Sequence, residues 1–134
     1  MTNGFHHIAI TAADFDRTIQ FYAQGLGFSL KRSWGEPGSR AAMLDLGDGG
    51  CIEIFEGSGQ IPKGSDPKAA GCWLHLAVKT SDTRALFQQA LAAGATVHQE
   101  PADLTIQSQP HPLPVTIAFV YGPDGELIEF FQER

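Results

Sequence analysis

Basic side chains are scarce in this sequence of 134 residues. Nine lysines and arginines stand against fifteen aspartates and glutamates, which gives a formal net charge of −6. Nucleic acids and anionic membrane surfaces are bound by clusters of Lys and Arg, whereas the basic residues here are scattered along the chain. We therefore expect neither nucleic acid nor a membrane among the partners of this protein.

Cysteines and long apolar runs are also rare. Two cysteines, Cys51 and Cys72, are too few for a disulfide scaffold, so we expect a reducing, cytoplasmic setting. No apolar run approaches the roughly 20 residues of a membrane span, and the N-terminus shows no secretory signal. Hydrophobic residues make up 43% of the chain, which is enough for a single packed domain over residues 1–134.

The sequence contains an internal repeat. HIAITAAD (residues 7–14) and HLAVKTSD (residues 75–82) share a pattern of His, aliphatic and Ala that ends in Asp. A second pair of similar segments is DGGCIEIF (residues 48–55) and DGELIEFF (residues 124–131). The double glycine and DG stretches are typical of hairpin turns before a strand. The repeat therefore predicts two structural units of one design.

A helical pattern follows each copy of the first motif, with apolar residues at a spacing of three or four. Aspartate or serine at a helix start and glycine at its end are typical capping residues. The expected boundary residues are Asp14 with Gly25 or Gly27 for the first helix, and Ser81 or Asp82 with Gly94 for the second.

These patterns predict an α+β protein made of two tandem βαβββ modules, at residues 4–56 and 72–133. Residues 57–71 are rich in Gly, Pro and Ser and are expected to be a linker. Residues 105–114 carry three prolines and are expected to be a loop in the second module.

Strand alternation places four ligand-type side chains at repeat-equivalent positions. Successive side chains of a strand point to opposite faces of the sheet. One face of the repeated strands is aliphatic and is expected to pack on the helices. The opposite face carries His7, Glu53, His75 and Glu129.

Such a set favours a divalent cation. A carboxylate in an apolar setting is costly unless it has a partner or takes up a proton, and a cation would stabilise two carboxylates beside two imidazoles. Two nitrogen and two oxygen ligands suit Zn, Ni, Co, Mn or Fe better than Ca. We therefore predict one divalent transition metal per site, although each His or Glu taken alone could be structural or exposed.

Other residues are weaker candidates. His111 in the proline-rich loop could contact substrate or simply be exposed, and His98 lies outside the repeat pattern. His6 has the opposite parity to His7 and is expected to be structural or exposed. Three aromatic residues share the ligand face and could line a substrate pocket or pack in the core: Phe55, Trp73 and Phe131.

The stretches HHIAITAADFDRTIQFYAQGLGF, WLHLAVKTSD and GPDGELIEFF resemble the vicinal oxygen chelate superfamily, which includes glyoxalase I, bleomycin resistance proteins and dioxygenases. This resemblance covers both modules. It implies a cup-shaped open sheet around one metal, with His7, Glu53, His75 and Glu129 as ligands. It also implies a homodimer, often with sites shared between chains.

The His/Glu/His/Glu set is most similar to bacterial glyoxalase I. The resemblance implies a metal-dependent lyase or isomerase that acts on a small α-hydroxycarbonyl or dicarbonyl-derived substrate through a metal-stabilised enediolate. Glu129 is the expected base, with Glu53 as the alternative. Thr11 stands where these enzymes typically have an arginine, GSG at residues 57–59 where they often place an asparagine, and no arginine stands just before His75. The thiol that the substrate carries could therefore be glutathione or a different thiol.

Two other readings remain. One is an iron-dependent dioxygenase or an epimerase on the same scaffold. The other is a small-molecule binding or resistance protein that has no catalytic activity.

Overall fold

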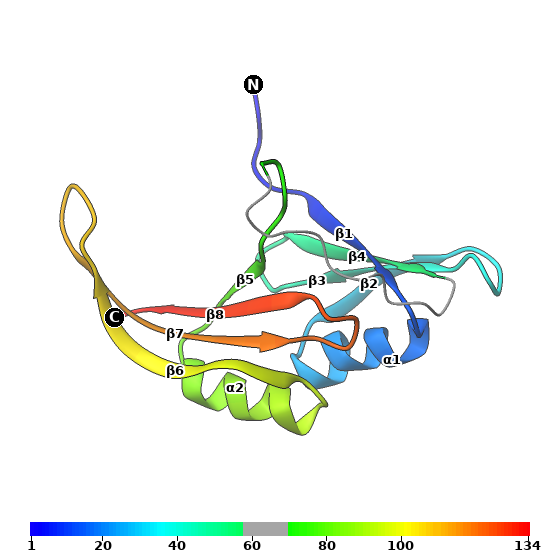
Figure 1. The fold of residues 1–134 in the computed structure, drawn as a ribbon. Coiled ribbons are helices and arrows are strands. Elements are labelled where there is room, and N and C mark those ends of the chain that lie inside the picture. Colours follow the sequence, from blue (N-terminus) through cyan, green and yellow to red (C-terminus); the bar gives the residue numbers. More distant parts are fainter. Residues whose placement is uncertain (58–69) are drawn as a thin grey trace. The chain divides into compact units, whose positions relative to one another are not determined.

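The structure, a computed structural model, describes residues 1–57 and 70–134 (Figure 1). Contacts within the chain divide it into two compact units, Met1–Ile61 and Pro62–Arg134. Most of the predicted linker, residues 58–69, lies outside the described residues. Each unit runs strand, helix and three strands, so the two tandem βαβββ modules of an α+β fold are confirmed.

The first unit contains one four-stranded sheet, in the order β1-β4-β3-β2. Strand β1 lies parallel to β4, and the other neighbours are antiparallel. Its elements are β1 (His7–Ala12), α1 (Phe15–Gln20), η1 (Phe21–Gly25), β2 (Ser29–Trp34), β3 (Ala41–Asp45) and β4 (Cys51–Glu56).

The second unit repeats this topology, in the order β5-β8-β7-β6, again with one parallel pair, β5 and β8. The predicted loop at residues 105–114 is shorter than expected, because β6 and β7 stay paired as far as Ile106 and Leu113. Pro114 lies near the start of β7, where a strand tolerates proline. The elements are β5 (Leu76–Lys79), α2 (Thr83–Ala92), β6 (Thr96–Ile106), β7 (Leu113–Tyr121) and β8 (Leu127–Glu133).

Both helices begin at the predicted aspartates. Asp14 Oδ1 accepts a hydrogen bond from the Arg17 backbone N–H at 3.1 Å, and Asp82 Oδ1 accepts one from that of Ala85 at 3.0 Å. Each carboxylate thereby satisfies one of the free N–H groups at a helix start. Gly94 follows α2 with a φ of 105°, a conformation that suits glycine at a helix end.

The first helix departs from the predicted regular pattern. α1 ends at Gln20 and continues as a π-helical turn, η1, in which the Leu26 N–H bonds to the Phe21 carbonyl at 3.0 Å. The rings of Phe21 and Tyr22, which are adjacent in sequence, are both buried in this wider turn. A regular amphipathic helix buries residues three or four apart along one face, so neighbouring residues are not usually buried together. Gly27, with a φ of 80°, follows the turn.

The aliphatic faces of the sheets form the core. Ile52 and Ile54 on β4 and Ile128 and Phe130 on β8 are almost fully buried. α1 contacts β4 and α2 contacts β8, so this is the helix-covered face of each sheet, as the alternation predicted. The opposite face is therefore left for the polar residues of β1, β4, β5 and β8.

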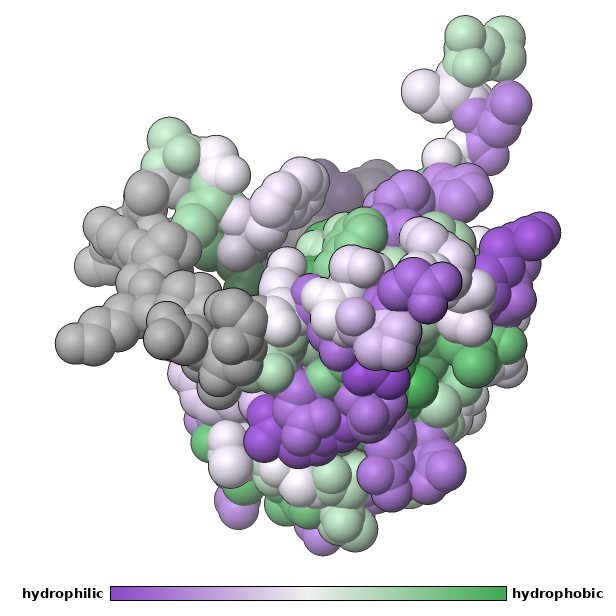
Figure 2. Space-filling model, turned by 90° about the vertical axis from the view of Figure 1, so that its right-hand side faces the viewer, coloured by the Kyte–Doolittle hydropathy of each residue, from purple (hydrophilic) through white to green (hydrophobic). Residues whose placement is uncertain are grey.

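The outer surface is mixed in character. Figure 2 shows hydrophilic and hydrophobic residues interspersed on one face of the molecule. Exposed apolar side chains such as Leu30 and Trp34 occur on the edge strand β2. Among the described residues, no helix is long and apolar enough to cross a membrane.

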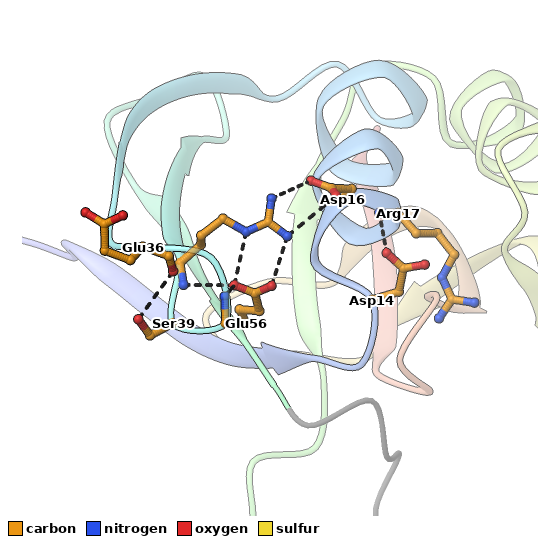
Figure 3. Close-up of polar contacts among 8 residues, drawn as sticks. Asp14, Asp16, Arg17, Glu36, Ser39 and Glu56 are labelled. Carbon is orange, nitrogen blue, oxygen red and sulfur yellow. Dashed lines mark hydrogen bonds and ion pairs between the residues drawn. The ribbon is translucent and has the colours of Figure 1, made fainter.

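Arg40 joins three parts of the first unit through Asp16 and Glu56, which Figure 3 labels. Its guanidinium donates from Nε and Nη2 to Glu56 at 3.0 and 2.9 Å, and from Nη1 to Asp16 at 3.0 Å. The same group lies 4.6 Å above the centre of the Phe15 ring, a cation–π geometry. Glu56 also accepts from the backbone N–H groups of Gly38 and Arg40. The contacts hold the end of β4 against the β2–β3 turn and the start of α1.

These hydrogen bonds, first those from the Arg40 side chain and then that from its backbone, lower the pKa of Glu56 from 4.5 to about 2. A depressed carboxyl pKa contributes stability that is present above pH 4.5 and is lost as the pH falls towards 2. We predict that Glu56→Gln lowers the urea midpoint at pH 7, and that the gap to the unaltered protein closes near pH 2.

Equilibrium urea titrations followed by circular dichroism at both pH values measure this. Glu36→Gln, a change at an exposed acid in the same turn region, is the matched control and should leave both midpoints unchanged. A Glu56→Gln deficit of equal size at pH 7 and pH 2 would contradict the role assigned to the ionised carboxylate.

Candidate functional site

The parallel strand pairs bring each predicted histidine beside its glutamate. In the first unit Ala9 of β1 lies opposite Glu53 of β4, and in the second Ala77 of β5 lies opposite Glu129 of β8. His7 stands two residues before Ala9 within β1 and therefore lies on the same face of the sheet. His75 directly precedes β5, and its side chain reaches Glu129 from the end of that strand.

The side chains form two pairs. His7 Nε2 lies 3.6 Å from Glu53 Oε1, and His75 Nε2 lies 2.9 Å from Glu129 Oε2. Two atoms that each lie 2.0–2.2 Å from one transition metal can be at most about 4 Å apart. Both pairs therefore have the donor types and the separation of two ligands on one ion.

Three or more His, Cys, Asp and Glu side chains do not gather into one metal-binding group anywhere in residues 1–57 and 70–134. The structure thus brings the four predicted ligands together two by two, one pair within each unit. A single site of all four remains a prediction.

The two carboxylates differ in environment. Glu129 is 8% exposed, and this burial raises its pKa, with the charge and hydrogen bond of His75 acting in the opposite direction. Glu53 is half-buried, and the distance to its histidine is longer. Glu129 is therefore the carboxylate held in the drier, more strongly paired position.

Both histidine rings have a second neighbour. His7 Nδ1 lies 2.8 Å from His6 Nδ1, which leaves Nε2 of His7 directed at Glu53. The His75 ring packs edge-on against Phe119, with 5.4 Å between ring centres. A hydrogen bond at the second ring nitrogen, as between His6 and His7, orients an imidazole whose other nitrogen binds a metal, whereas Phe119 supports the His75 ring by packing.

Sequence reasoning missed both neighbours. His6 precedes β1, so the strand alternation that placed it on the far face does not apply to it, although it is exposed as expected. Phe119 lies directly opposite Glu129 in the antiparallel β7–β8 pair. Alignment of the hairpin strands around the DG turn could have found it.

The residues predicted to contact substrate differ in how exposed they are. Trp73 is 87% exposed in the segment before β5, and Phe55 on β4 is 38% exposed. Phe131 on β8 is half-buried, and His111 is exposed, with its Nδ1 3.5 Å from the Pro112 carbonyl. Their contact with a substrate stays a prediction.

A cavity of about 380 Å³ lies elsewhere in the first unit, and none of the predicted ligands lines it. It is bounded by α1 and the edge of the sheet, with Phe15, Ile19, Leu30 and Trp34 among its walls. Three of its lining residues also take part in the contacts of the Arg40 guanidinium described above: Phe15, Asp16 and Arg40. This cavity is therefore separate from the His–Glu pairs.

Comparison with known proteins decides the family. The model of the glyoxalase/bleomycin resistance protein/dioxygenase superfamily matches residues 4–130. The chain belongs to this superfamily. The match spans both βαβββ units, so the repeat seen in the sequence and in the sheet order is the repeat of the glyoxalase fold.

Individual members of the superfamily are similar over nearly the whole chain. A probable lactoylglutathione lyase of Vibrio cholerae is 32% identical, covering 96% of this chain and 89% of its own length. A lactoylglutathione lyase of Arabidopsis thaliana is 30% identical, and this chain spans 44% of its length. The crystal structure of a glyoxalase family protein from Enterococcus faecalis has a TM-score of 0.72 at 25% identity, covering 96% of this chain and 97% of that one.

The raised pKa of Glu129 leads to a stability prediction. A carboxyl whose folded pKa is raised contributes stability below its unfolded pKa of about 4.5, and this is lost as the pH rises through the folded value. In protein treated with chelator, Glu129→Gln should therefore unfold at a higher urea concentration than the unaltered chain at pH 7. The difference should shrink at pH 4.

Glu133→Gln, at an exposed position of the same strand, is the matched control and should show no gain at pH 7. If Glu129→Gln proved less stable than the unaltered chain by the same amount at both pH values, the burial of the carboxylate would not be the dominant effect.

Proposed function

We propose that this protein is a metal-dependent lyase or isomerase of the glyoxalase I type. The observation that carries the proposal is the pair of repeat-equivalent His–Glu contacts, one in each unit, on the face of the sheet opposite its helix. Relatives named lactoylglutathione lyase, at 30–32% identity, support the reaction class. The substrate would be a small α-hydroxycarbonyl or dicarbonyl-derived adduct, such as the hemithioacetal of a 2-oxoaldehyde.

His7, Glu53, His75 and Glu129 would hold one divalent transition metal between them, either within one chain or across a homodimer. Their donor set, with imidazole nitrogen and carboxylate oxygen in equal number, fits Zn, Ni, Co, Mn or Fe. When bound, such a metal supplies a Lewis acid that stabilises negative charge on neighbouring substrate oxygens.

Glu129 is assigned as the group that moves the proton. In the metal-free chain, burial raises the pKa of Glu129, so its carboxylate is a stronger base than that of an exposed glutamate. Oε2 lies 2.9 Å from His75 Nε2 and would share the metal with it, so Oε1 is the oxygen assigned to proton transfer. The carboxylate would take the proton from one substrate carbon and return a proton to its neighbour. This isomerises the substrate without net loss of protons or electrons.

His75 positions this base. Its Nε2 and one carboxylate oxygen of Glu129 would be held together on the metal, and the edge of Phe119 supports the imidazole from the side. In the first unit the longer separation of His7 from Glu53 leaves that carboxylate less tightly held. Glu53 is therefore assigned to binding, and Glu129 to the proton transfer.

The identity of the thiol is a separate part of the proposal. The names of the relatives support glutathione. Thr11 is an exposed residue of β1 and lacks the charge of the arginine expected at that position, which favours a thiol with less negative charge. A comparison of several thiols in one assay separates these two possibilities.

Glu129→Gln tests the assignment of the base. General base catalysis contributes about 10²- to 10⁴-fold, so kcat should fall by that factor while circular dichroism and metal content are largely preserved. The assay follows proton exchange and product formation by NMR with hemithioacetals of several thiols, and Glu133→Gln should keep full activity. A Glu129→Gln enzyme with unaltered kcat would exclude this residue as the base.

Metal analysis of protein purified without chelator tests the reaction class. The proposal expects about one transition metal per site, with activity lost on chelation and restored by adding the metal. Iron together with oxygen uptake would instead indicate a dioxygenase. Protein without metal and without turnover would indicate a small-molecule binder.

A further inference from the structure

A bulge in strand β6 directs an imidazole onto the face that carries His75 and Glu129. Val97 pairs with Val120 and Gln99 pairs with Phe119, so His98 is an extra residue between two register positions. Bulges bend a strand and redirect a side chain, and they are frequent next to active sites. Here the His98 ring packs edge-on against Phe119 and Tyr121, with 6.0 and 5.0 Å between ring centres.

His98 and Tyr121 form a hydrogen-bonded pair. The Tyr121 hydroxyl lies 2.8 Å from His98 Nδ1. Both residues are exposed, Tyr121 by 36%. Because neither side chain of the pair is part of the core, the bulge gains little stability from the burial of apolar surface.

The pair lies beside the second His–Glu contact. Phe119 is directly opposite Glu129 in the β7–β8 ladder, and opposed residues of a ladder share one face of the sheet. The same Phe119 ring contacts both His75 and His98, so one phenyl ring separates the two imidazoles. Figure 1 shows β6, β7 and β8 as neighbours in this unit.

The hydrogen-bonding capacity of the pair is the same in either neutral tautomer. If the Tyr121 hydroxyl donates to His98 Nδ1, then Nε2–H is left as a donor and the phenol oxygen as an acceptor. If Nδ1–H donates to the phenol oxygen, then the hydroxyl is the donor and Nε2 the acceptor. The pair thus offers one free donor and one free acceptor, the complement of an amide group, which has one N–H and one C=O.

We propose that His98 and Tyr121, which lie one phenyl ring away from His75, bind an amide group in the thiol arm of the substrate. The inference rests on the proposed function and deepens it, since it assigns these two residues to substrate selection. Neither belongs to the ligand set, so they act through affinity and leave the proton transfer to Glu129.

Two thiols that differ only at the amide test this. N-acetylcysteamine carries N–H and C=O, and 2-mercaptoethyl acetate replaces the N–H by an ester oxygen. One net hydrogen bond is worth roughly 0.5–1.5 kcal/mol, so the KM of the ester hemithioacetal should be about 3- to 10-fold higher. Replacing both residues, His98→Phe together with Tyr121→Phe, removes every donor and acceptor of the pair, so this double variant should lose that preference and keep kcat unchanged.

Two further variants make the test specific. Val97→Ala alters an exposed neighbour that pairs with the buried Val120 on the helix-covered side, and it should keep the preference. His98→Gln retains one donor and one acceptor and should keep part of it. Circular dichroism and urea midpoints establish that each variant is folded.

Binding is measured separately from turnover. NMR titrations use the S-methyl thioethers of the same two thiols, which do not react, and resonances of His98 and Tyr121 are followed. Selective binding of the amide thioether by the unaltered protein, lost in the double phenylalanine variant, supports the inference even if no hemithioacetal is converted, and the proposed function alone would then fail. Equal binding of the two thioethers, or an unchanged preference in the double variant, overturns the inference.

Discussion

The parallel pairing of the first and last strand of each unit is the constraint on which the candidate site depends. Because Ala9 is opposite Glu53, His7 two residues upstream in β1 lies on the glutamate's face, and the pairing of Ala77 with Glu129 brings His75, at the start of β5, within reach of Glu129. A slip of one residue would turn the histidine away and expose the aliphatic side chains of the core. The core residues of β4 and β8 and the polar pairs on the other face therefore fix the same register together.

The two faces of each sheet have different roles. The helix-covered face supplies burial, and alternate side chains of β4 and β8 are buried there. The other face lies opposite the helix of its unit, so polar side chains can stand there without loss of the core. In the first unit, Arg40 ties the strand end to the helix start through Glu56 and Asp16, which steadies the strand that carries Glu53.

Features that follow from chain-local rules were predictable from the sequence. The aspartate caps, the order of elements and the faces of the repeated strands all depend on spacing, and the repeat supplied a second copy against which to check each one. Three other features were not predictable. The π-helical turn, the bulge at His98 and the His6–His7 contact arise where the backbone leaves its regular period, and a spacing argument assumes that period. The relation of His98 to His75 needed the register of three strands as well.

The inequality of the two His–Glu pairs has a consequence for the product. A duplicated fold begins with two equivalent carboxylates, and two equal bases could deliver a proton to either side of a planar carbon, which gives a racemate. Here one carboxylate is buried and held at 2.9 Å from its histidine, while the other is more open at 3.6 Å. Under the proposed function, the two repeat-equivalent carboxylates are therefore no longer equal. One of them alone would transfer the proton, and the product would have a single configuration.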